Sequence, residues 1–222
     1  MLDAIDVVGR GRLGGALVAR LAEAGRLATN RPPDLVILCV PDGAIAEVAP
    51  RQAIGPWVAH MSGATPLTAL APHTRRFGLH PLQTFVRNRG PEQFDGAWAA
   101  VTGETDEARD QARALAALLG LQPFDLAETR RALYHAGATL AAGHLVALYR
   151  AAAQVMDRVG VPPRALVPLM RRTMDNDFEL TGPAARGDVG TIAAHLEALH
   201  RDLPELEPIY RVLAGTIGPV PD

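Results

Sequence analysis

A glycine-rich turn near the start of the chain limits the possible folds more than any other feature. It follows a short apolar segment, residues 5–8, and precedes helical apolar spacing, and it consists of Gly9, Arg10, Gly11, Arg12, Leu13 and Gly14. The pattern G-x-G-x-x-G between a strand and a helix is typical of dinucleotide binding. Its first glycine permits the tight turn, its second lets the backbone approach a pyrophosphate, and its third lets helix and strand pack closely. A purely structural turn is the alternative.

Strand-like and helix-like segments alternate after this turn. The continuous apolar run over residues 34–40 is typical of a strand that helices cover on both faces of a parallel sheet. Further strands are expected at 57–61, 77–80 and 98–102, with helices at 41–49 and 105–119. From residue 127 the pattern is helical throughout, with helices at 127–159, 164–174, 188–199 and 204–214. We therefore predict an α/β fold: a Rossmann-like parallel-sheet domain over 1–126, then an all-helical domain over 127–222.

The second repeat of the α/β pattern is shortened. Only eight residues separate Gly25 from Asp34, enough for a strand at 26–29 but not for a helix. The expected strand ends at Asn30 and Arg31, where no acidic residue is available for a ribose hydroxyl. An arginine there favours the 2′-phosphate of NADP over NAD, although Arg31 as a solvated loop residue is equally compatible with the sequence.

Two later loops are expected beside the cofactor. Val40 and Pro41 lie at the end of the apolar run, and Ser62 follows the next strand. Ligands bind at the carboxyl ends of strands in such sheets, so these residues would flank a nicotinamide. Ser62 as a simple turn residue is the alternative.

The composition excludes several classes of chemistry. The chain contains no lysine, and all 22 basic residues are arginine, so a lysine Schiff base or a lysine general acid is excluded. The net charge of −2 favours neither nucleic acid nor a membrane surface, and no apolar run is long enough to span a bilayer. No residues have metal-ligand spacing. The single cysteine, Cys39, lies in an apolar run, and we interpret it as a core residue of a cytoplasmic protein.

Five polar residues are candidates for the chemistry. His80 ends a strand and can act as a general acid near neutral pH, as can Tyr134 or His135 in the long helical segment. Gln83 is a candidate to hold a substrate carbonyl or carboxylate, and Arg186 an anionic group. Each has a structural alternative: a turn cap for His80, helix packing for Tyr134 and His135, and a surface ion pair for Arg186.

Six stretches together resemble a known family, and they span almost the whole chain: GRGRLGGAL, DLVILCVPDGAIAEVA, HMSGATPL, GLHPLQTF, ALYHAGATLAAGHLVALY and LTGPAARGD. They are similar to bacterial Rossmann-like proteins with a C-terminal helical domain of unknown function, related to the 6-phosphogluconate dehydrogenase C-terminal domain. The wider superfamily includes pyrroline-5-carboxylate reductase, imine reductases, ketopantoate reductase and β-hydroxyacid dehydrogenases.

The resemblance implies an NADP-dependent oxidoreductase that forms a homodimer through its helical domains, with the active site in the cleft between the domains. Two departures stand out. The second helix of the Rossmann half is missing, and Ala142-Gly143 replaces the Ser-Asn pair expected in the long helix.

The missing lysine bears on the substrate. The β-hydroxyacid dehydrogenases and ketopantoate reductases resemble one another in using a lysine to protonate a carbonyl oxygen, which this chain cannot do. Either a C=N bond is reduced, or a histidine replaces the lysine to reduce a C=O bond. The second hypothesis is a degenerate, non-catalytic relative that keeps the dimer scaffold as a binding or regulatory module.

Overall fold

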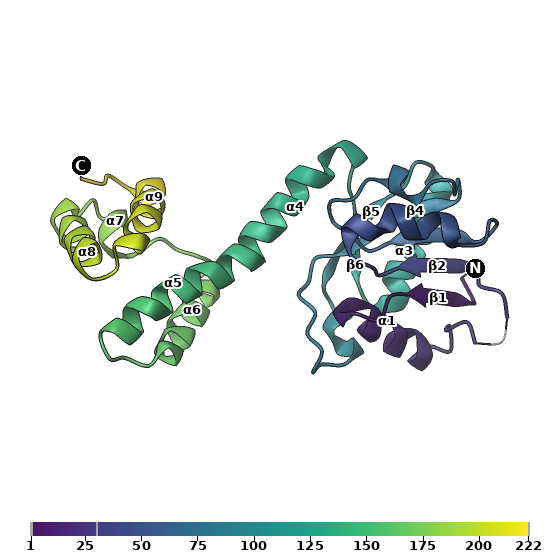
Figure 1. Cartoon of the computed structure of the whole chain (residues 1–222), viewed down its shortest axis with the longest axis horizontal. Helices are drawn as coiled ribbons and strands as arrows, with labels where there is room; N and C mark the ends of the chain where they lie inside the picture. The colour runs from purple at the N-terminus through teal and green to yellow at the C-terminus, as the bar shows by residue number, and fades with distance from the viewer. Residues whose placement is uncertain (1, 30, 222) are drawn as a thin grey trace. The chain divides into compact units, whose positions relative to one another are not determined.

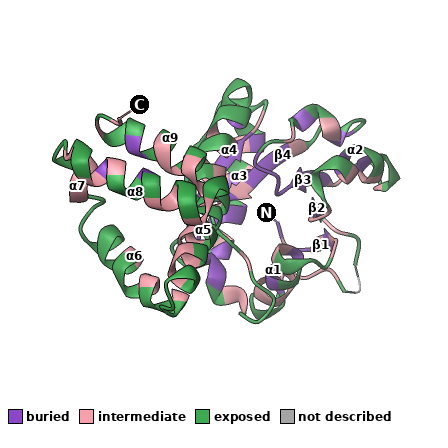
Figure 2. Ribbon diagram, turned by 60° about the vertical axis from the view of Figure 1, so that its left-hand side comes forward, coloured by how far each residue is buried: buried purple, intermediate pink, exposed green. Residues whose placement is uncertain are grey.

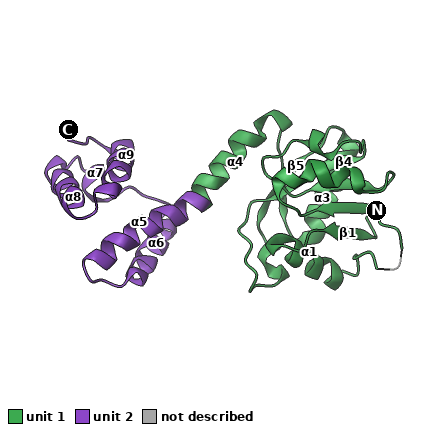
Figure 3. Ribbon diagram, in the orientation of Figure 1, with its two compact units in different colours: residues 1–142 green, residues 143–222 purple. Residues whose placement is uncertain are grey.

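The computed structural model describes residues 2–29 and 31–221 and divides into two compact units, Met1–Ala142 and Gly143–Asp222 (Figure 3). The unit boundary falls inside a helical stretch. The predicted domain boundary between residues 126 and 127 stays a prediction.

Unit 1 is built on a six-stranded sheet with the order β1-β2-β3-β4-β5-β6 (Figure 1). Strands β1 to β4 are parallel, β5 is antiparallel to β4, and β6 is parallel to β5. The strands are β1 Ile5–Val8, β2 Leu35–Leu38, β3 Trp57–His60, β4 Arg76–Pro81, β5 Trp98–Thr102 and β6 Gln122–Asp125. We call the edge at which β1 to β4 end the carboxyl edge, and the edge at which they begin the amino edge.

Both faces of this sheet are covered. All four residues of β2 are buried, and those of β3 likewise. Leu35 and Ile37 pack into one core with α1 (Arg12–Glu23) and α3 (Asp106–Leu119), whereas Val36 and Leu38 pack into a second core with α2 (Ile45–Val48). Alternating side chains of one apolar strand therefore serve two cores, as the continuous run predicts. Figure 2 shows buried residues concentrated in these strands.

One predicted strand is corrected, and one strand of the sheet was not predicted. The expected strand at 26–29 is reduced to a single parallel bridge between Leu27 and Ile5, because the chain pairs there through only two backbone hydrogen bonds. Strand β6, an edge strand with the sequence QPFD, was not predicted. Its residues are mostly exposed, so it carries no apolar alternation that would identify it.

The remaining helices lie C-terminal to β6. They are α4 Arg131–Thr139, α5 Leu145–Arg158, α6 Leu166–Asp175, α7 Gly182–Ala185, α8 Val189–Asp202 and α9 Glu207–Ile217. A π-helical segment, Leu140–His144, separates α4 from α5 and contains the Ala142-Gly143 pair. No helix in the described ranges combines the length and apolar character that crossing a membrane requires. The Rossmann-like sheet followed by a helical region confirms the predicted fold class.

Candidate active site at the carboxyl edge of unit 1

The glycine turn lies at the carboxyl edge, directly after β1. Gly9 has φ of +103°, and a Cβ there would lie 2.5 Å from the carbonyl oxygen of Cys39. A Cβ at Gly14 would overlap the carbonyl oxygen of Gly9. Both positions therefore exclude side chains, and the strand, turn and helix pack closely.

Gly11 differs from these two glycines because the space beside it is open. It is the N-cap of α1, it is exposed, and a Cβ there would have no atom within 4 Å. No side chain caps the helix, and the first turn of α1 contains no acidic residue. Backbone N–H groups at a helix N-terminus attract phosphate, and exposed Arg10 and Arg12 add positive charge. This turn fits a pyrophosphate, and Leu13 packs beneath it against the core.

The loops after β2 and β3 are joined by hydrogen bonds. Ser62 Oγ donates to the Asp42 carboxylate at 2.7 Å and accepts from the backbone N–H of Thr65 at 3.0 Å. Val40 and Pro41 lead directly into Asp42 on the neighbouring strand end. Ser62 thus has a definite structural role here, and its hydroxyl has no histidine partner that would make it a nucleophile.

Three of the predicted catalytic residues come together. Nδ1 of His80 lies 2.8 Å from the Tyr134 hydroxyl, and the rings of His80 and His135 are 5.6 Å apart. Gly63 makes room for them, because a Cβ there would lie 2.5 Å from His135 and 2.9 Å from His80. His80 extends from β4, whereas Tyr134 and His135 extend from α4. The sequence named these residues as separate candidates, and the fold makes them one cluster.

Burial controls the protonation of this cluster. Burial, with His135 and Arg131 nearby, lowers the pKa of His80 to about 4. Burial raises the pKa of the Tyr134 hydroxyl to about 12. At neutral pH both side chains are therefore uncharged, and each carries one proton bound to a ring nitrogen or a phenol oxygen. One proton makes the mutual hydrogen bond, and the other is free for a ligand.

A buried arginine beneath the cluster was missed by the sequence analysis. Arg131 is only 2% exposed, and it donates from Nη1 to Thr102 Oγ1 at 2.9 Å and from Nη2 to the carbonyl oxygen of Ser62. Its guanidinium lies over Gly78, where a Cβ would be 3.0 Å from Nη1. In the sequence it is one of many arginines, and nothing marks it as buried.

His60 and Arg131 together form a buried polar layer beneath the His80 cluster. His60 lies next to Gly78 in the strand pairing, is fully buried, and accepts from the backbone N–H of Ser62 through Nδ1 at 3.3 Å. Its Nε2 and the Nε of Arg131 have no hydrogen-bond partner among the described residues. Burial, and then the charge of Arg131, lowers the pKa of His60 to about 3. Arg131 is therefore the permanent charge of this layer.

The other predicted site residues that the structure describes are exposed. Gln83 is exposed, and its side chain accepts from the backbone N–H of Thr84. Arg186 is exposed in unit 2. Arg31 is exposed and donates to the carbonyl oxygen of Asp3, which precedes β1, whereas the glycine turn follows β1. Asn30 lies outside the described residues. Among the described residues, neither Gln83 nor Arg31 makes a hydrogen bond to the His80 cluster.

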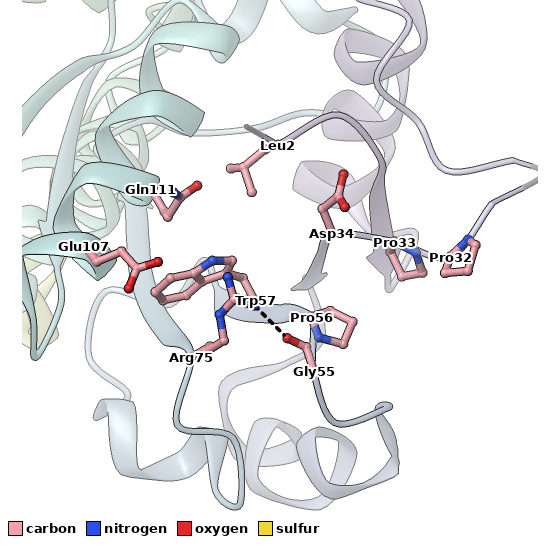
Figure 4. A pocket seen from close by; sticks show the side chains of 10 residues that line it. All are labelled: Leu2, Pro32, Pro33, Asp34, Gly55, Pro56, Trp57, Arg75, Glu107 and Gln111. Atoms are coloured by element: carbon pink, nitrogen blue, oxygen red, sulfur yellow. Dashed lines mark hydrogen bonds between the residues drawn. The ribbon is translucent and has the colours of Figure 1, made fainter.

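A hollow of about 510 Å³ lies at the amino edge (Figure 4). Arg75 stacks over Trp57, 4.9 Å from the ring centroid, and donates to the carbonyl oxygen of Gly55. The hollow is lined by Leu2, Pro32, Pro33, Asp34, Gly55, Pro56, Trp57, Arg75, Glu107 and Gln111. Ligands of open parallel sheets bind at the opposite edge, so we do not assign the site here. The described residues contain no group of three or more potential ligands arranged for a metal.

Comparisons with known proteins agree with the fold. A "putative NADP oxidoreductase" of Bacteroides fragilis superposes with a TM-score of 0.81 at 22% identity, covering 97% of each chain. A Thermotoga maritima protein gives 0.72 at 22% identity over 96% of this chain and 98% of its own. The 1-pyrroline-5-carboxylate reductase of Streptococcus pyogenes gives 0.62 at 17% identity over 96% of each chain.

The sequence comparisons place the chain in a family. No curated protein matches it. The model of one family, the domain of unknown function DUF2520, matches residues 97–217, which are more than half of the 222 residues. The chain therefore belongs to the DUF2520 family.

Proposed function

We propose that this protein is an oxidoreductase that binds NADP at the glycine turn and transfers hydride to a small C=N or C=O substrate. The observation that carries the proposal is the neutral His80–Tyr134 pair at the same sheet edge as an open helix N-terminus. Because β1 and β4 belong to one parallel set, cofactor turn and proton donor lie on the side where such folds bind ligands.

Each part of the site has a defined task. The backbone around Gly11 and the charges of Arg10 and Arg12 hold the pyrophosphate. The loops that end at Pro41 and Ser62 border the nicotinamide, which supplies the hydride when bound. His80 and Tyr134 hold the proton that a substrate atom receives. His135 packs beside them against Gly63 as an alternative donor.

NADP rather than NAD is part of the proposal. The described residues between Gly25 and Asp34 form no helix, and the loop offers Arg31 and no acid for the ribose. For this role the guanidinium of Arg31 must exchange its contact with Asp3 for the 2′-phosphate. Arg31→Ala should then weaken NADPH binding about tenfold and leave NADH binding unchanged.

The direct experiment is a fluorescence titration with NADPH and NADH. We expect saturable binding that is tighter for NADPH. Gly11→Asp places a carboxylate where the pyrophosphate should lie, in space that is open in the protein, so this variant should fold and lose NADPH affinity. Gly15→Ala, also in open space but inside α1, is the matched control. Unchanged affinity in Gly11→Asp would overturn the assignment of the turn.

A second copy of the chain is the proposed partner. Helices α5 and α6 contain no buried residue, and unit 2 exposes large apolar side chains such as Val146, Leu169 and Val212. Amphipathic helices with so little burial need a cover from outside their own unit. We expect a homodimer in sedimentation equilibrium, and a monomer at micromolar concentration would contradict it.

The alternative proposal is a binding module without turnover. The reduced strand at Leu27 and the Ala142-Gly143 pair within the π-helical segment favour it. NADPH binding without oxidation by any imine or carbonyl compound would support this alternative over the reductase.

A further inference from the structure

We propose that the carboxyl edge of unit 1 reduces neutral carbonyl compounds rather than iminium cations, and that the buried guanidinium of Arg131 discriminates between them. This inference rests on the proposed function and narrows its substrate class.

The charge of Arg131 is the basis of this discrimination. A guanidinium stays protonated in proteins, and among the described residues this one makes hydrogen bonds only to the neutral oxygens of Thr102 and Ser62. The ion pairs of the described residues give it no carboxylate within 4 Å. A buried charge is screened far less than an exposed one, so its field reaches the neighbouring groups.

The nearby carboxylates offset this field only in part. Asp42 and Glu128 are both exposed, and each is engaged elsewhere: Asp42 with the Ser62 hydroxyl, and Glu128 with the backbone N–H of Leu67. Water screens both carboxylates, whereas Arg131 is almost fully buried. The charge of Arg131 therefore lowers the pKa of His80 by more than the charge of Asp42 raises it.

The position of Arg131 brings its charge close to the donor pair. Arg131 begins α4, and Tyr134 lies three residues later, almost one turn along the same face. Gly78, above which the guanidinium lies, and His80 are on the same face of β4 because they are two residues apart. The guanidinium of Arg131 therefore lies beside both members of the donor pair: Tyr134 on its own helix α4, and His80 on strand β4. It also holds the Ser62 carbonyl, next to Gly63, which faces both histidines.

Hydride transfer to a carbonyl compound and hydride transfer to an iminium cation place different charges at this site. In carbonyl reduction the carbon accepts the hydride of NADPH, the C=O π electrons move to oxygen, and that oxygen takes a proton from the His80–Tyr134 pair. The pair is left with one negative charge, which Arg131 stabilises, until water returns the proton. The products are an alcohol and NADP.

Reduction of an iminium cation requires neither the proton of the His80–Tyr134 pair nor the charge of Arg131. The carbon of the cation accepts the hydride, its π electrons move to nitrogen, and the product is a neutral amine with no proton transferred. Binding it would place a second positive charge beside a buried guanidinium, which is unfavourable in a poorly screened site. The site is thus built for a substrate that begins neutral and gains negative charge on oxygen.

The test uses ligands that match in size and differ in charge. The two ligands are cyclopentanol, the five-membered alcohol, and pyrrolidinium, the cation that the five-membered amine forms in water at pH 7. They are titrated against the protein saturated with NADP at pH 7 and constant ionic strength. We expect cyclopentanol to bind at least about tenfold more tightly. Arg131→Met should reduce this ratio at least about tenfold, because the repulsive charge is gone. Ligand-observed NMR suits the weak affinities of such small molecules.

Control variants separate charge from folding. Arg131→Lys keeps the charge and should keep the preference for cyclopentanol, and circular dichroism checks that both variants fold. Arg75→Met removes an arginine at the amino edge and should leave the ratio unchanged. Equal or tighter binding of pyrrolidinium by the wild type overturns the inference, as does an unchanged ratio in a folded Arg131→Met variant.

Turnover supplies an independent readout. Cyclopentanone and 1-pyrrolinium, offered with NADPH, should give faster NADPH oxidation with the ketone, and faster reduction of 1-pyrrolinium would contradict the inference. Failure of NADPH to bind at all would instead remove the proposed function. NADPH binding together with an iminium preference would remove only the substrate class proposed here.

Discussion

The two edges of the unit 1 sheet differ in how deeply their basic side chains are buried. At the carboxyl edge, His60 and Arg131 are buried and keep nitrogen atoms without partners. At the amino edge, Arg75 lies exposed at the rim of the hollow and packs on Trp57. Burying polar groups without partners costs free energy, so a fold that does so at one edge points to function there. Hollow volume alone points to the other edge, but none of the residues that line the hollow is among the described residues with an unpartnered buried nitrogen.

The largest expected effect comes from breaking the donor pair. Tyr134→Phe removes the hydrogen bond to His80, and kcat should fall about 100-fold or more with NADPH affinity unchanged, because only proton transfer is lost. Unit 2 supplies a matched control in the exposed pair His195–Tyr210, whose atoms lie 2.6 Å apart. Tyr210→Phe should keep full activity. Equal losses in both variants would mean that the carboxyl edge has no special role.

The next effect concerns packing at the glycine turn. Gly14→Ala forces a methyl group against the Gly9 carbonyl oxygen, and we expect it to lower the free energy of unfolding by about 3 kcal/mol. Gly15→Ala, on the same helix but in open space, should raise it by about 0.5 kcal/mol because alanine favours helix. Both tryptophans lie in unit 1, so urea unfolding followed by tryptophan fluorescence reports this unit. Similar changes in both variants would contradict the close packing.

The buried histidines predict a pH dependence of stability. The pKa of His80 is about 4 when folded and 6.5 when unfolded, so the unfolded chain binds more protons between these values. The free energy of unfolding that depends on neutral, buried His80 is fully present above pH 6.5 and is lost as the pH falls through 4. The free energy of unfolding, measured with urea at pH 7 and at pH 5, should differ less between the two pH values for His80→Gln than for the wild type. His200→Gln, an exposed histidine of unit 2, is the control.

The smallest effect is expected at the amino edge. Arg75→Ala removes the stacking on Trp57 and should cost about 1 kcal/mol or less of stability. The dissociation constant for NADPH should stay within about twofold of the wild type, since the hollow is not the cofactor site in our proposal. A loss of NADPH affinity in this variant would reverse the assignment of the two edges.

The alternation of strand and helix was readable in the sequence, and so were the glycine turn and the helical second half. Continuous apolar runs and glycine positions are local signals, and each matches its element closely, as in β5 at 98–102 and the N-cap Thr105 of α3. The strand at 26–29 and β6 were not predictable in the same way. Both lie at sheet edges, where pairing with a neighbour decides whether a short polar segment becomes a strand.

The sequence by itself determined which chemical groups the protein has: a glycine-rich turn, histidines and a tyrosine that can donate protons, and no lysine. Only the tertiary structure decided that His80, Tyr134 and His135 form one cluster, with Arg131 buried beneath it. The reason is physical. Residue identity fixes a group's chemistry, whereas its burial, and with it the pKa of His80 and the strength of the Arg131 charge, depends on residues far away in the chain that fold around it.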